Sequence, residues 1–210
     1  MRTYVKLTLT AATAAVVLGT AVSSVTARRI EVSSQRFHQL WLIEIVGQFA
    51  TIRCPLTLEG SFHSKTTSKV AGQLVGYVSR ITVGNTSCPA GHLTALTETI
   101  PWHITYEGFG GVLPRITEIR LLYIGMAFRA ELLGSSCLAV TTNTEPAEGA
   151  LVVEPNTGQI TLLNPNPNRS IPTTAGCPAG PTVHVEGLSE VFAGGVESGN
   201  STRITVRLVQ

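Results

Sequence analysis

The chain has 210 residues, of which 43% are hydrophobic and only 13% are charged. Every acidic residue is a glutamate, and the 13 glutamates stand against 15 lysines and arginines. The absence of aspartate excludes an EF-hand loop and any catalytic triad or metal site that depends on Asp. A length of this order fits one domain with a sizeable core.

The N-terminal segment has the pattern of an export signal. Arg2 and Lys6 form a short positive region, and residues 7–22 are uncharged and mostly apolar or small. Val25-Thr26-Ala27 then forms a small-residue cleavage motif. The apolar run is too short and too rich in threonine to predict a membrane span, although an uncleaved anchor is the alternative.

Cleavage after Ala27 would give a neutral mature chain. We expect a signal peptide over 1–27 and a single secreted β domain over 28–210, outside the cell or at the cell envelope. Loss of Arg2 and Lys6 with the signal leaves 13 basic against 13 acidic residues. A neutral chain with few charges favours neither nucleic acid nor anionic lipid as a partner, and we expect no nucleic acid.

The four cysteines are Cys54, Cys88, Cys137 and Cys177. In an exported chain they predict two disulfides, for which three pairings are possible. The pairing Cys54–Cys88 with Cys137–Cys177 is favoured, because neighbouring strands in a meander bring together residues that are close in sequence. A zinc site needs a short C-x-x-C spacing, which this sequence lacks, so no metal or cofactor is expected.

The clearest predicted strand begins at Cys54. Leu56, Leu58 and Phe62 alternate with polar residues, as in an antiparallel strand with one face on a core and one face in water. Pro55 is expected to interrupt the pairing at the start of this strand, because proline has no N–H for the ladder.

Other segments have the same short and alternating character. Two segments around Gly47-Gln48 predict a hairpin, although residues 37–44 also fit a helical spacing. The apolar run 116–133 predicts one long strand bent at Gly125. Residues 65–69 predict a polar turn, and further strands are expected over 70–83, 93–100, 102–109, 137–142, 149–153, 160–163, 182–192 and 202–209.

Residues 164–181 are rich in asparagine and proline and predict a long irregular loop. About ten short strands with turn signals between them, and no long helix, predict an all-β fold. The expected architecture is an antiparallel sandwich or barrel.

The segment Thr51 to Ser64, TIRCPLTLEGSFHS, resembles an uncharacterised family of small secreted proteins from high-GC Gram-positive (actinobacterial) soil bacteria. The resemblance continues through LVGYV at 74–78, ETIPWH at 98–103 and TRITV at 202–206. It implies export and a shared β fold. It brings no activity and no functional residues.

Histidines and glutamates share faces on three predicted strands, because side chains two residues apart point the same way. The sets are Glu59 with His63, His103 with Thr105 and Glu107, and His184 with Glu186. Neighbouring strands would bring imidazoles and carboxylates together, as zinc binding or glycoside hydrolysis requires. The preferred interpretation is that these residues are solvated side chains of outer faces, because their spacing is not specific.

Other chemistries have weaker signals. The chain has no Gly-x-Ser-x-Gly elbow and no Asp to orient a histidine. The glycine-rich segment 108–111 leads to Pro114 and not to a helix, so it predicts a turn and not a phosphate loop. Large aromatic residues that could line a sugar or lipid pocket are expected in the core. They are Trp41, Trp102, Tyr77, Tyr106 and Tyr123.

The sequence thus predicts a secreted, non-enzymatic β module that binds a partner or has a structural role, with no catalytic residue assigned. The expected partner is a cell-wall component or an apolar small molecule. The alternatives are a small hydrolase of polysaccharide or wall material, and a barrel that carries an apolar ligand or forms a pore. A filled core would favour the binding module, an open lumen the carrier, and a cleft joining His63, His103 and Glu107 the hydrolase.

Overall fold

The computed structural model describes residues 29–46, 51–84, 88, 91–113, 115–132, 135–163, 182–186, 189–199 and 201–209. They form fifteen strands and two 3-10 turns, η2 (Thr97–Thr99) and η3 (Val196–Ser198). The strands are β1 (Arg29–Val32), β2 (Arg36–Val46), β3 (Thr51–Phe62), β4 (Thr66–Ser68), β5 (Leu74–Val83), β6 (Gly91–Ala95), β7 (Trp102–Val112), β8 (Arg115–Ile124), β9 (Ala127–Leu132), β10 (Ser135–Val140), β11 (Ala147–Val153), β12 (Ile160–Leu163), β13 (Thr182–Glu186), β14 (Ser189–Ala193) and β15 (Val206–Val209). The predicted all-β fold is confirmed. In the described part of the chain, no helix has the length and apolar character needed to cross a membrane.

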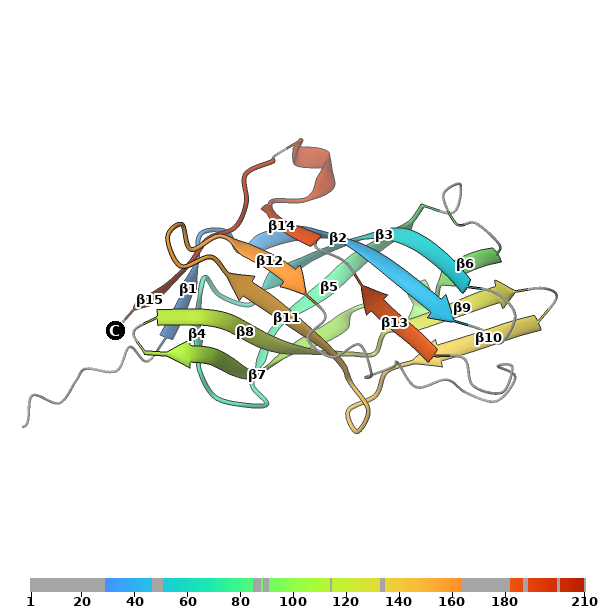
Figure 1. The fold of residues 1–210 in the computed structure, drawn as a ribbon, viewed down its shortest axis with the longest axis horizontal. Helices are drawn as coiled ribbons and strands as arrows, with labels where there is room; N and C mark the ends of the chain where they lie inside the picture. Colours follow the sequence, from blue (N-terminus) through green and yellow to red (C-terminus); the bar gives the residue numbers. More distant parts are fainter. Residues whose placement is uncertain are drawn as a thin grey trace, which may run out of the picture.

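Eight strands close into an antiparallel barrel (Figure 1). Their order around the ring is β2, β3, β5, β7, β8, β11, β12, β14 and β2 again. Each barrel strand therefore pairs with the next barrel strand along the chain, which makes this an up-and-down barrel. The seam lies at β14, which joins β12 through two residue pairs and β2 through three. The other half of the same edge of β2 pairs with β13.

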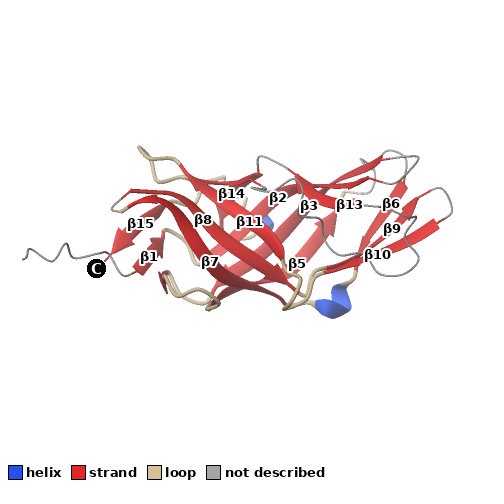
Figure 2. Ribbon diagram, turned by 60° about the horizontal axis from the view of Figure 1, so that its bottom comes forward, coloured by secondary structure: helices blue, strands red, loops and turns tan. Residues whose placement is uncertain are grey.

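A three-stranded sheet lies at each end of the barrel (Figures 1 and 2). The cap sheet has the order β15-β1-β4 and joins the first described strand to the last, with Arg29 opposite Val209. The end sheet has the order β10-β9-β6. It packs closely on β3, because a Cβ on Gly91 would collide with the side chain of Ile52. The molecule is therefore elongated, with the barrel between two small sheets.

Aromatic and aliphatic side chains fill the barrel interior. Trp41 is 4% exposed and Tyr123 is fully buried, and their rings meet edge-on with centroids 5.0 Å apart. Both donate to the Oε1 atom of buried Gln39, from Trp41 Nε1 at 3.0 Å and from the Tyr123 hydroxyl at 3.4 Å. Burial raises the pKa of Tyr123. Interior polar atoms thus satisfy one another, as buried polar groups must.

The predicted core positions of Trp41, Trp102, Tyr106 and Tyr123 are confirmed, since none is more than 4% exposed. Burial also raises the pKa of Tyr106, whose hydroxyl has no hydrogen-bond partner among the described residues. Tyr77 is the exception. It is only half-buried and lies on the outer face of β5.

Pro55 does not interrupt its strand, contrary to expectation. β3 runs through it without a break, and Pro55 pairs with Leu42 of β2. The N–H and C=O of one strand residue point to the same side. The Pro55 carbonyl accepts a bond from Gly84 N at 2.8 Å, so the missing N–H faces the end of β5 and costs β2 no bond.

The expected long strand over 116–133 is two strands in different sheets. It divides at Gly125, where the backbone has a φ of 86° that favours glycine. β8 stays in the barrel, whereas β9 forms the centre of the end sheet. The prediction of one bent strand was wrong because Gly125 redirects the chain from one sheet to another.

Other boundaries also differ from expectation. The predicted turn at 65–69 contains β4, which pairs with β1, and residues 97–99 form η2 and not strand. The segment 182–192 holds β13 and the start of β14. The helical alternative near Phe37 is wrong, because both edges of β2 are paired.

The predicted Cys54–Cys88 disulfide is confirmed, with the two Cα atoms 4.6 Å apart. It joins β3 to the segment that leads into β6. The second predicted pairing includes Cys177, which lies outside the described residues. The predicted loop 164–181 and the Gly47-Gln48 turn also lie outside them, although β2 and β3 pair as the two arms of the expected hairpin.

Candidate functional site

The three predicted His/Glu sets lie on strands that are not neighbours. The order along the wall is β13-β2-β3-β5-β7, so β5 separates β3 from β7, and β2 separates β13 from β3. Strands in a sheet lie about 4.8 Å apart, so the sets with His103 and His184 are roughly 19 Å apart along the wall. The backbones of His184 and Glu186 pair with Glu44 and Leu42, and their side chains lie outside the described part.

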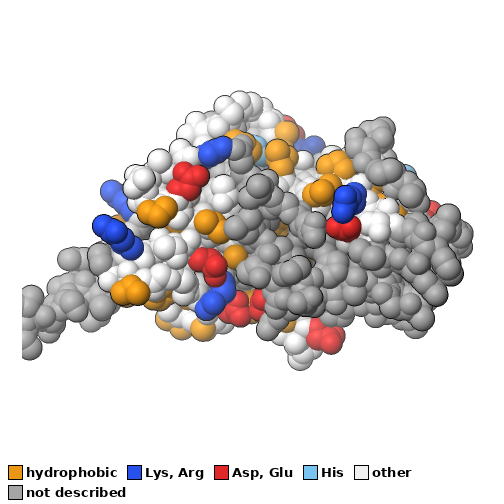
Figure 3. Space-filling model, viewed as in Figure 1, with side chains coloured by type: hydrophobic (Ala, Val, Ile, Leu, Met, Phe, Trp, Pro, Cys, Tyr) orange, Lys and Arg blue, Asp and Glu red, His pale blue; other side chains and the backbone are white. Residues whose placement is uncertain are grey.

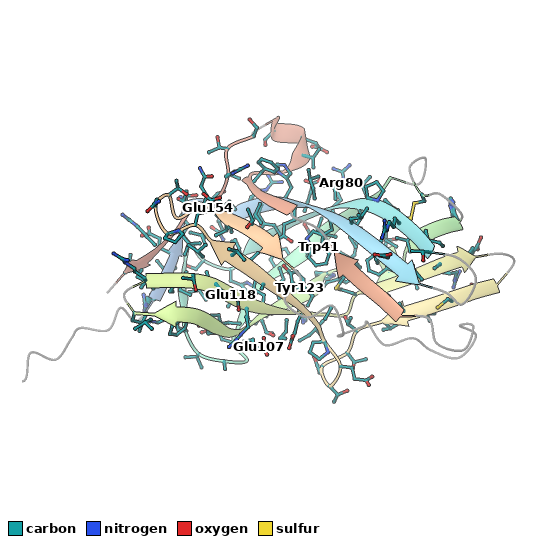
Figure 4. All side chains as sticks on the ribbon, in the orientation of Figure 1. Trp41, Arg80, Glu107, Glu118, Tyr123 and Glu154 are labelled. Carbon is teal, nitrogen blue, oxygen red and sulfur yellow. A yellow bond between two sulfur atoms is a disulfide. The ribbon has the colours of Figure 1, made fainter. Side chains whose placement is uncertain are left out.

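Glu59 holds a surface segment in place. One oxygen, Oε1, lies 3.6 Å from Nη1 of Arg80, and the other accepts the N–H of Val196 at 3.2 Å (Figure 4). Arg80 also donates a hydrogen bond to Glu197 at 2.6 Å, and this bond together with the charge of Glu59 raises the pKa of Arg80. Glu59 thus anchors η3 over the barrel wall, which is a structural role.

Glu107 belongs to a second ion-pair group on the outer wall. Its Oε2 lies 3.9 Å from Nε of Arg120, which is also 4.0 Å from Glu118 Oε1 (Figure 4). Gly108 leaves room for this guanidinium, because a Cβ at that position would lie 2.9 Å from Nη2 of Arg120. The group therefore couples β7 to β8 across the surface.

The structure does bring two of the predicted histidines to one place. His63 and His103 are exposed, and they lie on either side of Tyr77. The ring centroids of His63 and Tyr77 are 5.7 Å apart. His103 is directly opposite Tyr77 in the pairing of β5 with β7, a position that places Cβ atoms about 5 Å apart. We call His63, Tyr77 and His103 the His–Tyr patch.

Polar and apolar side chains continue the patch along the same outer face. Ser61 lies opposite Tyr77 on β3, and Thr105 lies opposite Leu74, which is 40% exposed. Tyrosine, histidine, serine and threonine can all donate and accept hydrogen bonds. The surface therefore combines an aromatic ring with hydroxyl and imidazole groups, and it suits a partner with both apolar and hydroxylated faces.

The alternative of a metal site finds no support in the described residues. Among them, no group of three or more histidine, cysteine or acidic side chains is arranged to hold a metal ion. His63 directly follows β3 and His103 lies on β7, and Tyr77 of β5 lies between them.

An apolar cavity of about 30 Å³ lies between the barrel interior and the cap sheet. Its volume is close to the share of one molecule in liquid water. The lining residues are Ile30, Val32, Phe62, Thr67, Val75, Ile119, Leu121, Leu151, Ile160 and Val206. Such a space is a packing void and not a lumen for a lipid chain.

The sequence offered a weak signal for the His–Tyr patch that the first interpretation missed. The alternation in residues 74–78 is broken at Gly76, where the register between β5 and β7 shifts. This bulge allows both Leu74 and Tyr77 to face outward, whereas strict alternation would place them on opposite faces. Counting from the bulge would have moved Tyr77 from the core to the surface.

Comparisons with known proteins assign no family. No family model matches the chain, no curated protein is similar to it, and no solved structure matches its fold. The geometry of the wall is therefore the ground for a functional conclusion.

Proposed function

We propose that this protein is an exported, non-catalytic binding module that holds a neutral cell-wall polysaccharide on the outer wall of its barrel. The observation that carries the proposal is the His–Tyr patch, in which exposed His63 and His103 flank half-buried Tyr77. A sugar ring has C–H faces that pack on an aromatic ring, and hydroxyls that pair with imidazole and hydroxyl groups.

The filled interior supports a site on the outside. Trp41, Trp102 and Tyr123 pack in the core, and the cavity beneath the cap sheet is only about 30 Å³. The outward positions of the wall include Arg80, Glu118 and Arg120. A membrane pore would need an outward apolar band, so these charges favour a binding wall over a pore.

Two observations support export. The first described strand begins at Arg29, two residues after the predicted cleavage point at Ala27. Removal of the signal would therefore take away no part of β1. The Cys54–Cys88 disulfide is typical of proteins in oxidising compartments, and the resemblance to small secreted actinobacterial proteins agrees with this location.

The test is retention of the exported protein on insoluble wall polysaccharide. We expect the native protein to be retained and Tyr77→Ala to lose about tenfold in affinity, because loss of an aromatic anchor removes the centre of the contact. His103→Ala should have a smaller effect. His92→Ala is the matched control, since His92 is also exposed but lies on the end sheet.

Equal retention of the native protein and the Tyr77→Ala variant would contradict the proposal, as would no retention of either. The same incubation tests the hydrolase alternative. Release of soluble sugar that disappears in His103→Ala would support catalysis and replace the binding function. Retention without release would support the module.

A further inference from the structure

Two surface grooves meet at Arg207 on the cap end of the molecule. One, of about 300 Å³, is lined by Glu31, Val32, Ser33, Lys65, Thr205 and Arg207. The other, of about 150 Å³, is lined by Arg115, Ile116, Val153, Glu154, Pro155, Gly158, Val206, Arg207 and Leu208. Arg207 is therefore the wall that the two grooves share, with Lys65 on one side and Arg115 on the other.

The cations of this end have unused bonding capacity. Arg207 Nε donates to Glu31 Oε2 at 2.5 Å, and its two terminal nitrogens have no protein partner within the described ranges. Arg29, Lys65 and Arg115 form no ion pair with any described residue.

Three other arginines of the molecule differ in this respect. Arg53 pairs with Glu44 at 3.0 Å, and Arg80 and Arg120 each lie within 4.0 Å of two glutamates. The cap end therefore carries cations that form no ion pair with a described residue. Figure 3 shows Lys and Arg side chains at the end where β1 and β15 lie, and others over the rest of the visible face.

Charge counts give the same picture. At the cap end, Arg29, Lys65, Arg115 and Arg207 face only Glu31 and Glu154, an excess of two positive charges. In the rest of the described chain, seven basic residues stand against eleven acidic ones. Among the described residues, the cap end is therefore positive and the remainder is negative. Such a field draws anions to one end.

We propose that the cap end binds a phosphate group, with Arg207 at its centre and Lys65 and Arg115 on either side. A guanidinium matches phosphate oxygens through parallel N–H bonds, and the side chain of Arg207 is 75% exposed. Inorganic phosphate carries between one and two negative charges near neutral pH and a lipid phosphodiester carries one, which suits four cations beside two carboxylates. Ser33 adds a hydroxyl donor, because its oxygen already accepts the Thr205 N–H at 3.0 Å.

This site is separate from the His–Tyr patch and does not depend on it. The patch lies on strands β3, β5 and β7 of the wall, and the phosphate site lies on β1, β15, the start of β8 and the segment before β4. Phosphate could reach the site as a lipid headgroup or as a free ion. The chemistry of recognition is the same, so the experiment has one arm for each source.

The exported protein is titrated with inorganic phosphate, and it is sedimented with vesicles of phosphatidylglycerol and phosphatidylcholine or of phosphatidylcholine alone. Arg207→Gln with Lys65→Gln should weaken binding by about tenfold, because charge-assisted bonds are lost. Lys65→Gln alone should weaken binding less than the double variant does. It leaves the Glu31–Arg207 ion pair in place. Arg129→Gln removes the same charge from the exposed face of the end sheet, and it should change affinity by less than about twofold.

Binding of inorganic phosphate that the double variant loses supports recognition of the phosphate group itself. Binding only to the anionic vesicles, lost in the same variant, supports a headgroup as its source. The proposal is overturned if the native protein binds neither probe. It is also overturned if Arg129→Gln weakens binding as much as the double variant does.

Discussion

The two small sheets at the ends of the barrel are alike in size and differ in what holds them. In the end sheet, Phe128 is fully buried and meets Trp102 edge-on at 5.2 Å, and the Cys54–Cys88 disulfide ties its approach to β3. The cap sheet lies over a small cavity, and its outer face carries an exposed ion pair. The end sheet is therefore densely packed, whereas the cap sheet carries exposed charges.

The variant with the largest expected effect on this difference is Phe128→Ala in the end sheet. Truncation of a fully buried phenylalanine should cost about 3–5 kcal/mol, because it removes apolar burial and leaves a cavity. The midpoint of urea unfolding measures the loss. His92→Ala, exposed on the same sheet, should leave the midpoint nearly unchanged, and a comparable loss in both variants would contradict the packing account.

The disulfide is the second feature that distinguishes the end sheet from the cap sheet. Cys54 and Cys88 are 34 residues apart, so replacing both by serine should cost about 3–4 kcal/mol through the entropy of the unfolded chain. Unfolding of the double variant and of the native protein in denaturant gives the value. A loss below about 1 kcal/mol would mean that packing alone holds this end.

The cap end should instead gain stability from added volume. Val32→Ile places one methyl group beside the cavity of about 30 Å³ and should stabilise the fold by about 0.8 kcal/mol. Val78→Ile is the matched control, since Val78 is fully buried and does not line the cavity. It should destabilise the fold by about 1 kcal/mol through overpacking. Thermal unfolding of the two variants measures whether each substitution stabilises or destabilises the fold. Destabilisation by Val32→Ile would show that the cavity cannot accept the added methyl group.

The smallest expected effect is the pH dependence of the Glu31–Arg207 pair. The hydrogen bond donated by Arg207 is the main cause that lowers the pKa of Glu31 below 4.5; desolvation opposes it, and the charges of Arg207 and Lys65 add to the lowering. A lowered pKa gives stability that is present above pH 4.5 and is lost as the pH falls through the folded value. As the pH falls below 4.5, the Glu31→Gln variant should therefore lose less stability than the native protein does. Identical acid profiles of the two proteins would show that the pair contributes nothing.

Alternation predicted much of the fold. Leu56, Leu58 and Phe62 face the core as the pattern requires, because a strand with one wet face leaves a direct trace in its sequence. At Gly125, alternation does not predict the path of the chain. Whether a glycine bends a strand or sends the chain to another sheet depends on the partners of both halves, and these are distant in sequence.

The candidate sites were harder to predict from the sequence than the fold was. Arg29, Lys65, Arg115 and Arg207 are widely separated along the chain, and a neutral total hides their excess at one end. The His–Tyr patch depends on a bulge at Gly76 and on β5 lying between two strands that carry histidine. The first depends on the pairing of distant strands in the cap sheet and the second on the order of strands in the wall, and no local window of sequence contains either.

The order of strands in the ring has a consequence for the folding of the chain. β2 is among the first strands to be synthesised, yet its partner β14 is among the last. Until β14 arrives, β2 and β12 present unpaired edges that can aggregate or be cleaved. A molecule stalled before Ser189 would thus be an open sheet, which proteases can distinguish from the finished barrel.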